Sequence, residues 1–252
     1  MELTGAQIIA ECLLAQRVAT VFGYPGGAVL NIYDALYEYR DRIRHGLTAH
    51  EQGAAHAADG YARSTGKAGV VIATSGPGAT NLVTGIATAY MDSIPMVAIT
   101  GNVAVELLGR DSFQEVDITG ITMPVTKHNF AVKRVEDLAD IIRRAFQIAQ
   151  SGRPGPVLID VPSALASEAM VFDYPDEVNL PSYRPTYKGN VKQVKQAVNL
   201  IRESKRPVLY VGGGIVSSGA TPELTELAET MKIPVVNTLT GKRAYPEPHY
   251  PH

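Results

Sequence analysis

The feature that most constrains the fold of this chain is a repeated alternation of short apolar segments with longer amphipathic ones. The apolar segments have the length of buried strands, and the others repeat apolar residues with a helical period. Parallel strands need crossovers that cover both faces of a sheet. We therefore predict an α/β fold with a doubly wound parallel sheet. The predicted strands are residues 19–23, 46–49, 69–74, 95–100, 130–133 and 156–161, and the predicted helices are residues 4–16, 51–64, 79–91 and 135–151.

A polar, proline-containing stretch interrupts this periodicity and divides the chain. We predict a first domain over residues 1–166, an interdomain linker over 167–190 and a second α/β domain over 191–252. The second domain should hold helices at residues 191–203 and 222–231 and strands at 207–211 and 234–237. Two strands are too few for an independent core, so we expect a Rossmann-like central domain that is truncated at the end of this sequence.

Composition narrows the possible partners and compartment. The 252-residue chain has a net charge of −2 and no long run of Lys or Arg, which argues against nucleic acid and anionic membranes as partners. Its single cysteine, Cys12, cannot form a disulfide within the chain, and we expect a buried structural thiol. The start lacks the build of a secretory signal, and no apolar run approaches the roughly 20 residues that span a bilayer. We expect a cytoplasmic protein without membrane contact.

Two familiar ligand motifs nearly match and fail on spacing. Five residues separate Gly60 from Gly66 where a phosphate-binding loop needs four, so Gly66 is interpreted as a helix end. His50 and His56 are six residues apart, whereas a helical zinc motif needs histidines four apart. We predict no metal ligands in this chain.

Glu51 is the acidic residue best placed for chemistry. It follows a predicted strand and begins a predicted helix, where open α/β sheets present functional groups. A glutamate in a first helical turn also interacts favourably with the helix dipole, so position alone supports both interpretations. Glycines after two other predicted strands, at Gly26-Gly27 and Gly76-Pro77-Gly78, allow close approach to the backbone. A tight turn can explain any one of these loops, but together they favour a shared ligand cleft.

Several segments together resemble the pyrimidine-binding domain of thiamine-diphosphate enzymes and, within that class, the catalytic subunit of acetolactate (acetohydroxyacid) synthases. The resemblance covers essentially the whole chain. It implies that pyruvate is decarboxylated on thiamine diphosphate and joined to a second 2-oxo acid, pyruvate or 2-oxobutanoate, in branched-chain amino acid biosynthesis. The segments that carry it are Phe22-Gly23-Tyr24-Pro25-Gly26-Gly27-Ala28, His50-Glu51-Gln52-Gly53-Ala54-Ala55-His56, Asp59-Gly60-Tyr61-Ala62-Arg63, Ser75-Gly76-Pro77-Gly78-Ala79-Thr80-Asn81, Gly109-Arg110-Asp111-Ser112-Phe113-Gln114-Glu115-Val116-Asp117, Thr126-Lys127-His128 and Gly152-Arg153-Pro154-Gly155-Pro156-Val157.

The resemblance also implies roles for single residues. Glu51 would activate the cofactor through its pyrimidine ring, with the backbone of Gly27 and the side chain of Gln114 near the reacting carbon. The other implied cofactor residues are Tyr24, Pro25, Gly26, Ala28, Pro77, Asn81 and Ser93. Phe113 and Lys127 would line the substrate approach, and Arg153 with Gly212, Gly213 and Gly214 would contact FAD. Core packing for Phe113, a solvated charge for Lys127 and a strand-start ion pair for Arg153 stay open as alternatives.

The sequence departs from the family pattern at two places. Ser163 stands where family members commonly carry a lysine, which bears on the choice of second substrate. The Gly-Asp-Gly and Asn-Asn pattern is absent from these residues, so Mg²⁺ and the diphosphate would be held by a further, carboxyl-terminal domain. We therefore expect the 252 residues alone to be inactive.

The resemblance further implies a homodimer or homotetramer, often with a small regulatory subunit. A pyruvate oxidase or 2-oxo acid decarboxylase of the same cofactor class is the alternative enzyme. A non-catalytic nucleotide-binding module is the alternative outside it.

Overall fold

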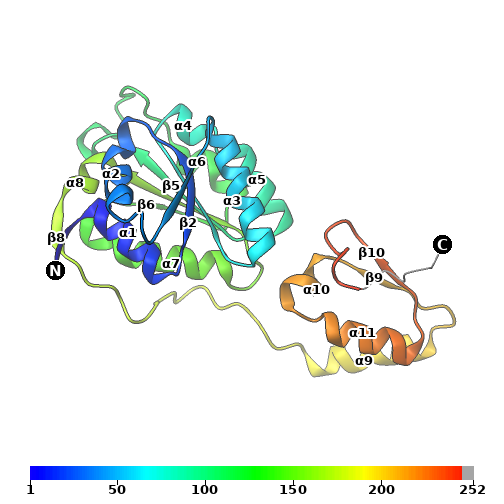
Figure 1. The fold of residues 1–252 in the computed structure, drawn as a ribbon. Helices are drawn as coiled ribbons and strands as arrows, with labels where there is room; N and C mark the ends of the chain where they lie inside the picture. Colours follow the sequence, from blue (N-terminus) through cyan, green and yellow to red (C-terminus); the bar gives the residue numbers. More distant parts are fainter. Residues whose placement is uncertain (246–252) are drawn as a thin grey trace. The chain divides into compact units, whose positions relative to one another are not determined.

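A computed structural model describes residues 1–245 of the protein. It separates into two compact units, Met1–Pro185 and Thr186–His252. The first unit carries the predicted doubly wound sheet and the second the shorter α/β segment (Figure 1). Residues 246–252, the end of the predicted central domain, lie outside the described residues. Within residues 1–245, no helix combines the length and apolarity needed to cross a membrane.

Six parallel strands form the sheet of the first unit, in the order β3-β2-β4-β5-β7-β6. They are β2 (Thr20–Tyr24), β3 (Arg44–Leu47), β4 (Gly69–Ala73), β5 (Met96–Asn102), β6 (His128–Ala131) and β7 (Pro156–Pro162). β2 pairs with β3 on one side and with β4 on the other, so the winding of the chain reverses between β2 and β4. At such a reversal the loops after the two strands diverge and leave a crevice at the carboxyl edge of the sheet. All six predicted strands are confirmed, with ends that differ by up to two residues.

Helices cover both faces of this sheet (Figure 1). On one face lie α1 (Gly5–Ala15), α2 (Leu30–Glu38) and α7 (Leu138–Gln150), and on the other α3 (Glu51–Thr65) and α5 (Val83–Asp92). Alternate strand residues serve the two faces because side chains alternate along a strand. In β4, Val70 and Ile72 face the first group of helices, while Val71 and Ala73 face the second.

The two faces are packed with residues of different size. The α1, α2 and α7 face is filled by branched and aromatic side chains such as Ile9, Ile142 and Phe146. The α3 and α5 face uses small residues, and a Cβ added to Gly85 of α5 would lie 2.4 Å from the Cβ of Ala55 in α3. These two helices therefore approach each other closely, so the amino end of α3 is firmly placed.

The ends of the helices follow their sequence signals. The Thr4 hydroxyl accepts a hydrogen bond from the Gln7 N–H, and the Gln7 side chain accepts one from the Thr4 N–H, which is a capping box. Gly66 caps α3 with a left-handed φ of +72°, which confirms the predicted helix end. The predicted helix over 79–91 consists of α4 (Pro77–Thr80) and α5. The shorter elements are α6 (Ile118–Thr122), α8 (Ser163–Ser167) and four single 3₁₀ turns, Gly27–Val29, Val105–Leu107, Met123–Val125 and Val135–Asp137.

The structure corrects the beginning of the predicted linker. Residues 167–185 belong to the first unit: β8 (Ala169–Val171) pairs antiparallel with β1 (Glu2–Thr4), and Phe172, Leu180 and Tyr183 pack on the core. The sequence pattern does not predict this segment, because its apolar residues are spaced irregularly. They pack on the core of the first unit without following the period of a helix or strand.

The second unit has little core. It contains α9 (Val191–Glu203), β9 (Leu209–Val211), α10 (Gly213–Ser218), α11 (Thr221–Met231) and β10 (Val235–Asn237), and the two strands are parallel. Its buried cluster consists of Val211, Leu224 and Ala244, and α9 buries no residue. The predicted elements of this unit are confirmed, with the addition of α10.

Candidate active site

The carboxyl edge of the sheet gathers most of the predicted site residues. The loops after β2, β3 and β4 all end at this edge because the three strands are parallel and neighbours. They carry the glycine loop that contains Gly27, the helix start at Glu51 and the turn at Gly76. The winding reverses between β2 and β4, which is the place where open α/β sheets bind their ligands.

Glu51 begins α3 and is 8% exposed. The side-chain amide of Asn81, which follows α4, donates a 2.9 Å hydrogen bond to Glu51 Oε2. The other carboxylate oxygen, Oε1, faces Gly78, where an added Cβ would lie 3.2 Å from it. Within residues 1–245, Oε1 accepts no hydrogen bond from the protein. The site thus holds a carboxylate with one oxygen fixed by the chain and the other available to a donor from a ligand.

Thr74 links the loop after β2 to the turn after β4. Its hydroxyl accepts a 3.1 Å hydrogen bond from the N–H of Ala28. A Cβ on Gly26 would lie 2.5 Å from the Thr74 methyl group, and one on Gly78 would lie 2.6 Å from it. Gly26 and Gly78 are therefore required for packing, whereas Gly27 has no atom within 4 Å of its Cβ position and leaves its backbone open to a ligand.

The turn after β4 also supports Gln114. Gly76 has φ +57° and ψ −120°, a conformation that only glycine adopts readily. A Cβ there would lie 2.6 Å from the carbonyl oxygen of Gln114 and 2.9 Å from its Cα. The loop that follows β5 thus rests on this turn, and Phe113 projects from it with 87% of its surface exposed. The alternative of core packing for Phe113 is wrong within this chain.

Comparisons with known proteins agree with this geometry. Residues 3–121 match the thiamine pyrophosphate enzyme N-terminal TPP binding domain, and residues 194–251 match the thiamine pyrophosphate enzyme central domain. The chain belongs to the thiamine pyrophosphate enzymes.

The individual relatives that the chain matches include acetolactate synthase large subunits. The chain is 53% identical over 250 residues to a probable acetolactate synthase large subunit of Methanocaldococcus jannaschii, covering 98% of this chain and 42% of that protein. It is 54% identical over 250 residues to the acetolactate synthase large subunit of Corynebacterium glutamicum, covering 99% and 40%. A third, from Buchnera aphidicola, is 51% identical over 249 residues, covering 98% and 43%. The chain thus spans about two fifths of the length of these relatives.

Among the predicted site residues, the structure brings Glu51, Asn81, Pro77 and the loop over residues 24–28 to one edge. Pro77 occupies the first turn of α4, where proline is favoured because no N–H is needed. Tyr24 and Pro25 are exposed at the end of β2. Gln114 joins them through Gly76. The cofactor and substrate roles of these residues stay predictions.

Lys127 lies at the opposite, amino edge of the sheet. It precedes β6, and its N–H donates a 2.8 Å hydrogen bond to the carbonyl of Pro156. Its ammonium group donates to the carbonyl of Ser151 at 2.8 Å and to the Tyr183 hydroxyl at 2.9 Å, and also contacts the Ile148 carbonyl. The alternative of a freely solvated charge is therefore wrong. This chain does not bring Lys127 to the Glu51 edge, so a role in the substrate approach stays a prediction.

Ser93 and Arg153 also lie at the amino edge, and they contact each other. Ser93 ends α5 with a left-handed φ of +61°. The Arg153 guanidinium donates to Ser93 Oγ at 2.7 Å and to the Met91 carbonyl at 3.3 Å. Cations stabilise the carboxyl end of a helix, so Arg153 caps α5. The alternative of an ion pair at this strand start is wrong, because both acceptors of Arg153 are neutral.

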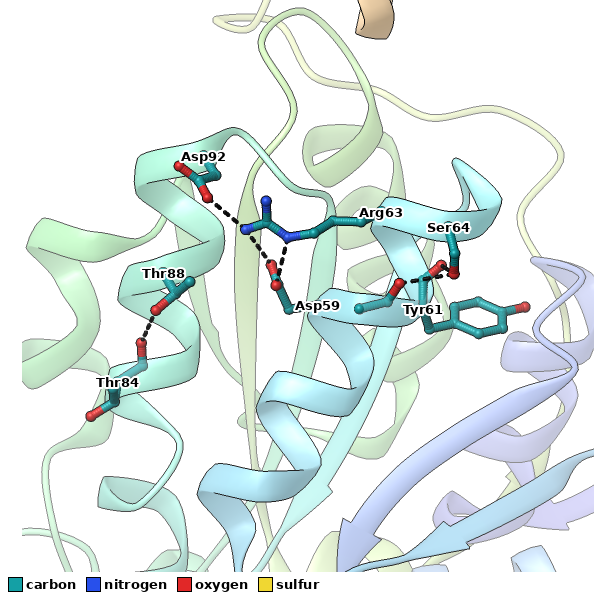
Figure 2. Close-up of polar contacts among 8 residues, drawn as sticks. Asp59, Tyr61, Arg63, Ser64, Thr84, Thr88 and Asp92 are labelled. Atoms are coloured by element: carbon teal, nitrogen blue, oxygen red, sulfur yellow. Dashed lines mark hydrogen bonds and ion pairs between the residues drawn. The ribbon is translucent and has the colours of Figure 1, made fainter. Parts of the chain in front are cut away.

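A second arginine joins α5 to the helix that carries Glu51. Figure 2 shows Arg63 of α3 between Asp59 of the same helix and Asp92 of α5. The guanidinium contacts Asp59 at 2.7 and 3.2 Å and Asp92 at 2.7 Å, and these bonds raise the pKa of Arg63. Asp59 is 7% exposed, so its charge is compensated almost entirely by this arginine. The contact fixes the spacing of α3 and α5.

Sequence reasoning missed a buried polar cluster at the carboxyl ends of β5 and β7. The Asp160 carboxylate, 5% exposed, accepts hydrogen bonds from Thr100 Oγ1 at 2.7 Å and Asn102 Nδ2 at 2.5 Å. Burial raises the pKa of Asp160 to about 6, with a smaller contribution from Asp117, while the two hydrogen bonds oppose the rise. A charged residue inside the apolar run over 156–161 was the available signal.

The glycine run of the second unit follows β9. Gly212 is the N-cap of α10, and Gly213 and Gly214 form its first turn. Gly213 packs on Thr240, with 3.2 Å between its Cβ position and that side chain, while Gly214 has nothing within 4 Å.

Among the described residues, no group of three or more His, Cys, Asp or Glu is placed to hold a metal ion.

Proposed function

We propose that this chain supplies the cofactor-activating half of an acetolactate synthase. The observation that carries the proposal is the Glu51 carboxylate, fixed by Asn81 through Oε2 and, within residues 1–245, without a protein donor at Oε1, at the carboxyl edge of a doubly wound sheet. The identity of 51 to 54% to acetolactate synthase large subunits supports the choice of reaction.

The residues present fit the aminopyrimidine ring of thiamine diphosphate. Oε1 of Glu51 can accept a hydrogen bond from a ring N–H, and the missing side chain at Gly27 leaves room for a flat group to approach. When bound, thiamine diphosphate supplies an electron sink for the decarboxylation of 2-oxo acids. We expect its diphosphate and Mg²⁺ to be held by residues outside this chain, as family resemblance implies.

The chain's own residues would then hold and move a proton. Glu51, 8% exposed, can exchange a proton with the ring at Oε1. The side-chain amide of Asn81 donates to Oε2 and so restrains the rotation of the carboxylate. Gln114 would meet the substrate from the loop that rests on Gly76, and Phe113 would line the approach. These groups orient the reactants, and orientation supplies a large part of an enzyme's rate.

The finer assignments of the proposal concern substrates and assembly. Pyruvate is the proposed donor, and pyruvate or 2-oxobutanoate the proposed acceptor. Ser163, which stands where family members commonly carry a lysine, bears on the choice between these acceptors. FAD contacts are proposed for Arg153 and Gly212 to Gly214, of which Arg153 already caps α5. A homodimer or homotetramer, a small regulatory subunit and a cytoplasmic setting complete the proposal.

The proposal is tested by Glu51→Gln in the complete enzyme that contains this sequence. Loss of a general acid–base group lowers rates by about 10²- to 10⁴-fold, so we expect kcat for acetolactate formation to fall by at least about 100-fold. The control is Glu136→Gln, an exposed glutamate of the Val135–Asp137 turn. A Glu51→Gln enzyme that keeps its full rate would refute the proposal, and so would a wild-type enzyme that forms no acetolactate from pyruvate.

A further inference from the structure

The loop between β5 and α6 has an unusual backbone. Gly109, Asp111 and Gln114 all have left-handed φ values, of +77°, +52° and +57°. The conformation is costly for residues with a Cβ, by about 1–2 kcal/mol each. Asp111 and Gln114 therefore need contacts that hold the loop in this shape.

The Glu115 carboxylate provides these contacts. One oxygen, Oε1, accepts a hydrogen bond from the N–H of Gly109, and Oε2 accepts one of 2.9 Å from the N–H of Ser112. The Glu115 N–H in turn donates to the Ser112 carbonyl at 2.9 Å. The bonds from Ser112 and Gly109 lower the pKa of Glu115 because they favour its charged form.

Glu115 has no cationic partner among the described residues. Both carboxylate oxygens of Glu115 therefore accept hydrogen bonds from the backbone of one loop. The Ser112 hydroxyl closes the same loop from the other side, through a 3.1 Å bond to the Leu107 carbonyl. The carboxylate is therefore the centre of a clamp that spans residues 107–115.

The clamp determines where two proposed substrate residues lie. Gln114 rests on Gly76, with 2.6 Å between its carbonyl oxygen and the Gly76 Cβ position, so a shift of the loop separates it from the turn that leads to Asn81. Phe113 makes little contact with the protein, because 87% of its surface is exposed. Its direction depends on the backbone of the loop alone.

We propose that Glu115 is a positioning residue of this site, which fixes Phe113 and Gln114 through the backbone of their loop without touching substrate itself. The inference rests on the proposed function, since the two positioned residues meet substrate only in that reaction. It assigns Glu115 a task distinct from that of Glu51, which faces the cofactor.

A first experiment tests the clamp without any activity. The 252-residue chain contains no tryptophan, so Phe113→Trp gives a single reporter at the tip of the loop. We expect Glu115→Gln in this background to lower the steady-state fluorescence anisotropy of the tryptophan, because an amide keeps one acceptor and turns an N–H donor toward the other backbone N–H. Glu106→Gln, an exposed change of equal charge in the same loop, should leave the anisotropy unchanged. Equal anisotropy for both variants would overturn the clamp.

A second experiment tests positioning in the complete enzyme. Misplacement of a reacting group by about 1 Å costs up to about 100-fold in rate, so we expect Glu115→Gln to lower kcat/KM for acetolactate formation ~10- to 100-fold with thiamine diphosphate affinity unchanged. Glu115→Asp keeps the charge and can still reach one of the two N–H groups, so it should recover part of the rate; it also serves if the glutamine variant does not fold. A loosened loop with kcat/KM within twofold of wild type would overturn the positioning role. A wild-type enzyme without acetolactate activity would instead refute the proposed function, and the anisotropy result would be unaffected.

Discussion

The buried Asp160 carboxylate should make the stability of this chain depend on pH in an unusual direction. Its pKa rises from 3.8 to about 6 on folding, and each pKa unit corresponds to about 1.4 kcal/mol. The folded state therefore binds this proton more tightly than the unfolded state. The resulting stabilisation is fully present below about pH 4 and is lost as pH rises through about 6, a change of about 3 kcal/mol.

The variant Asp160→Asn isolates this effect because asparagine does not ionise. Its oxygen can accept the hydrogen bond of Asn102, and its NH₂ group can donate to the Thr100 hydroxyl, so the cluster keeps two bonds. We expect the free energy of unfolding of the variant, relative to wild type, to rise by about 2 kcal/mol between pH 4.5 and pH 7.5. Urea unfolding of the 252-residue chain, followed by circular dichroism at four pH values, measures the difference.

The matched control is Asp137→Asn on the surface. A bond from Arg134 lowers the pKa of Asp137, so its small stabilisation has the opposite pH dependence and is lost as pH falls. A difference between Asp160→Asn and wild type that stays constant within about 0.5 kcal/mol over the same range would refute the reasoning. It would mean that Asp160 is hydrated or ionises normally in the folded protein.

Three further predictions concern packing. Gly76→Ala should lower the free energy of unfolding by about 2–3 kcal/mol, because the new side chain would meet both the φ of +57° and the contact with Gln114. Gly66 also has a left-handed φ but no atom of residues 1–245 near its Cβ position, so Gly66→Ala should cost about 1 kcal/mol. Equal losses for the two variants would exclude the contact with Gln114 as a cause. Arg63→Ala should lower the free energy of unfolding in urea by about 1–3 kcal/mol, because it leaves buried Asp59 unpaired. The control Arg134→Ala breaks an exposed ion pair and should cost less than about 1 kcal/mol. Similar losses for the two variants would show that Asp59 is solvated. Burial raises the pKa of the Cys12 thiol to about 12, so Cys12 should react with a thiol reagent only after unfolding, and rapid reaction of the native chain at pH 8 would contradict its burial.

The sheet could be predicted because its residues satisfy a local rule. Strand β4 is a continuous apolar run, and β7 is interrupted only by Asp160, as expected when both faces are covered. The end of α3 at Gly66 and the start of α1 at Thr4 were predictable for the same reason, since each depends on residues within one helical turn. The β1 and β8 pair could not be found in this way, because its partners are separated by about 165 residues and neither strand exceeds three.

The site residues also divide into those with a local sequence signal and those that depend on contacts with other parts of the chain. Glu51 and the glycine loops carry their signal at strand ends, so they were identified from the sequence. Thr74, Asp160 and the Glu115 clamp act through hydrogen bonds to residues elsewhere in the chain or to the backbone of a loop, and no spacing rule describes such contacts. The positions of Lys127 and Arg153 at the amino edge followed only from the strand directions.

The antiparallel pair of β1 and β8 has a practical consequence for work on the first unit. The N–H of Phe172 donates a 2.9 Å hydrogen bond to the carbonyl of Met1, so residue 1 and residue 172 are neighbours in space (Figure 1). The first unit continues to Pro185, so a linker from that residue back to residue 1 would give a circularly permuted unit, opened instead at an exposed turn such as that after α2 near Asp41. New ends at that turn, which precedes β3, would leave the loops around Glu51 uncut and would place a fluorescent or affinity tag at the amino edge of the sheet, opposite the Glu51 edge.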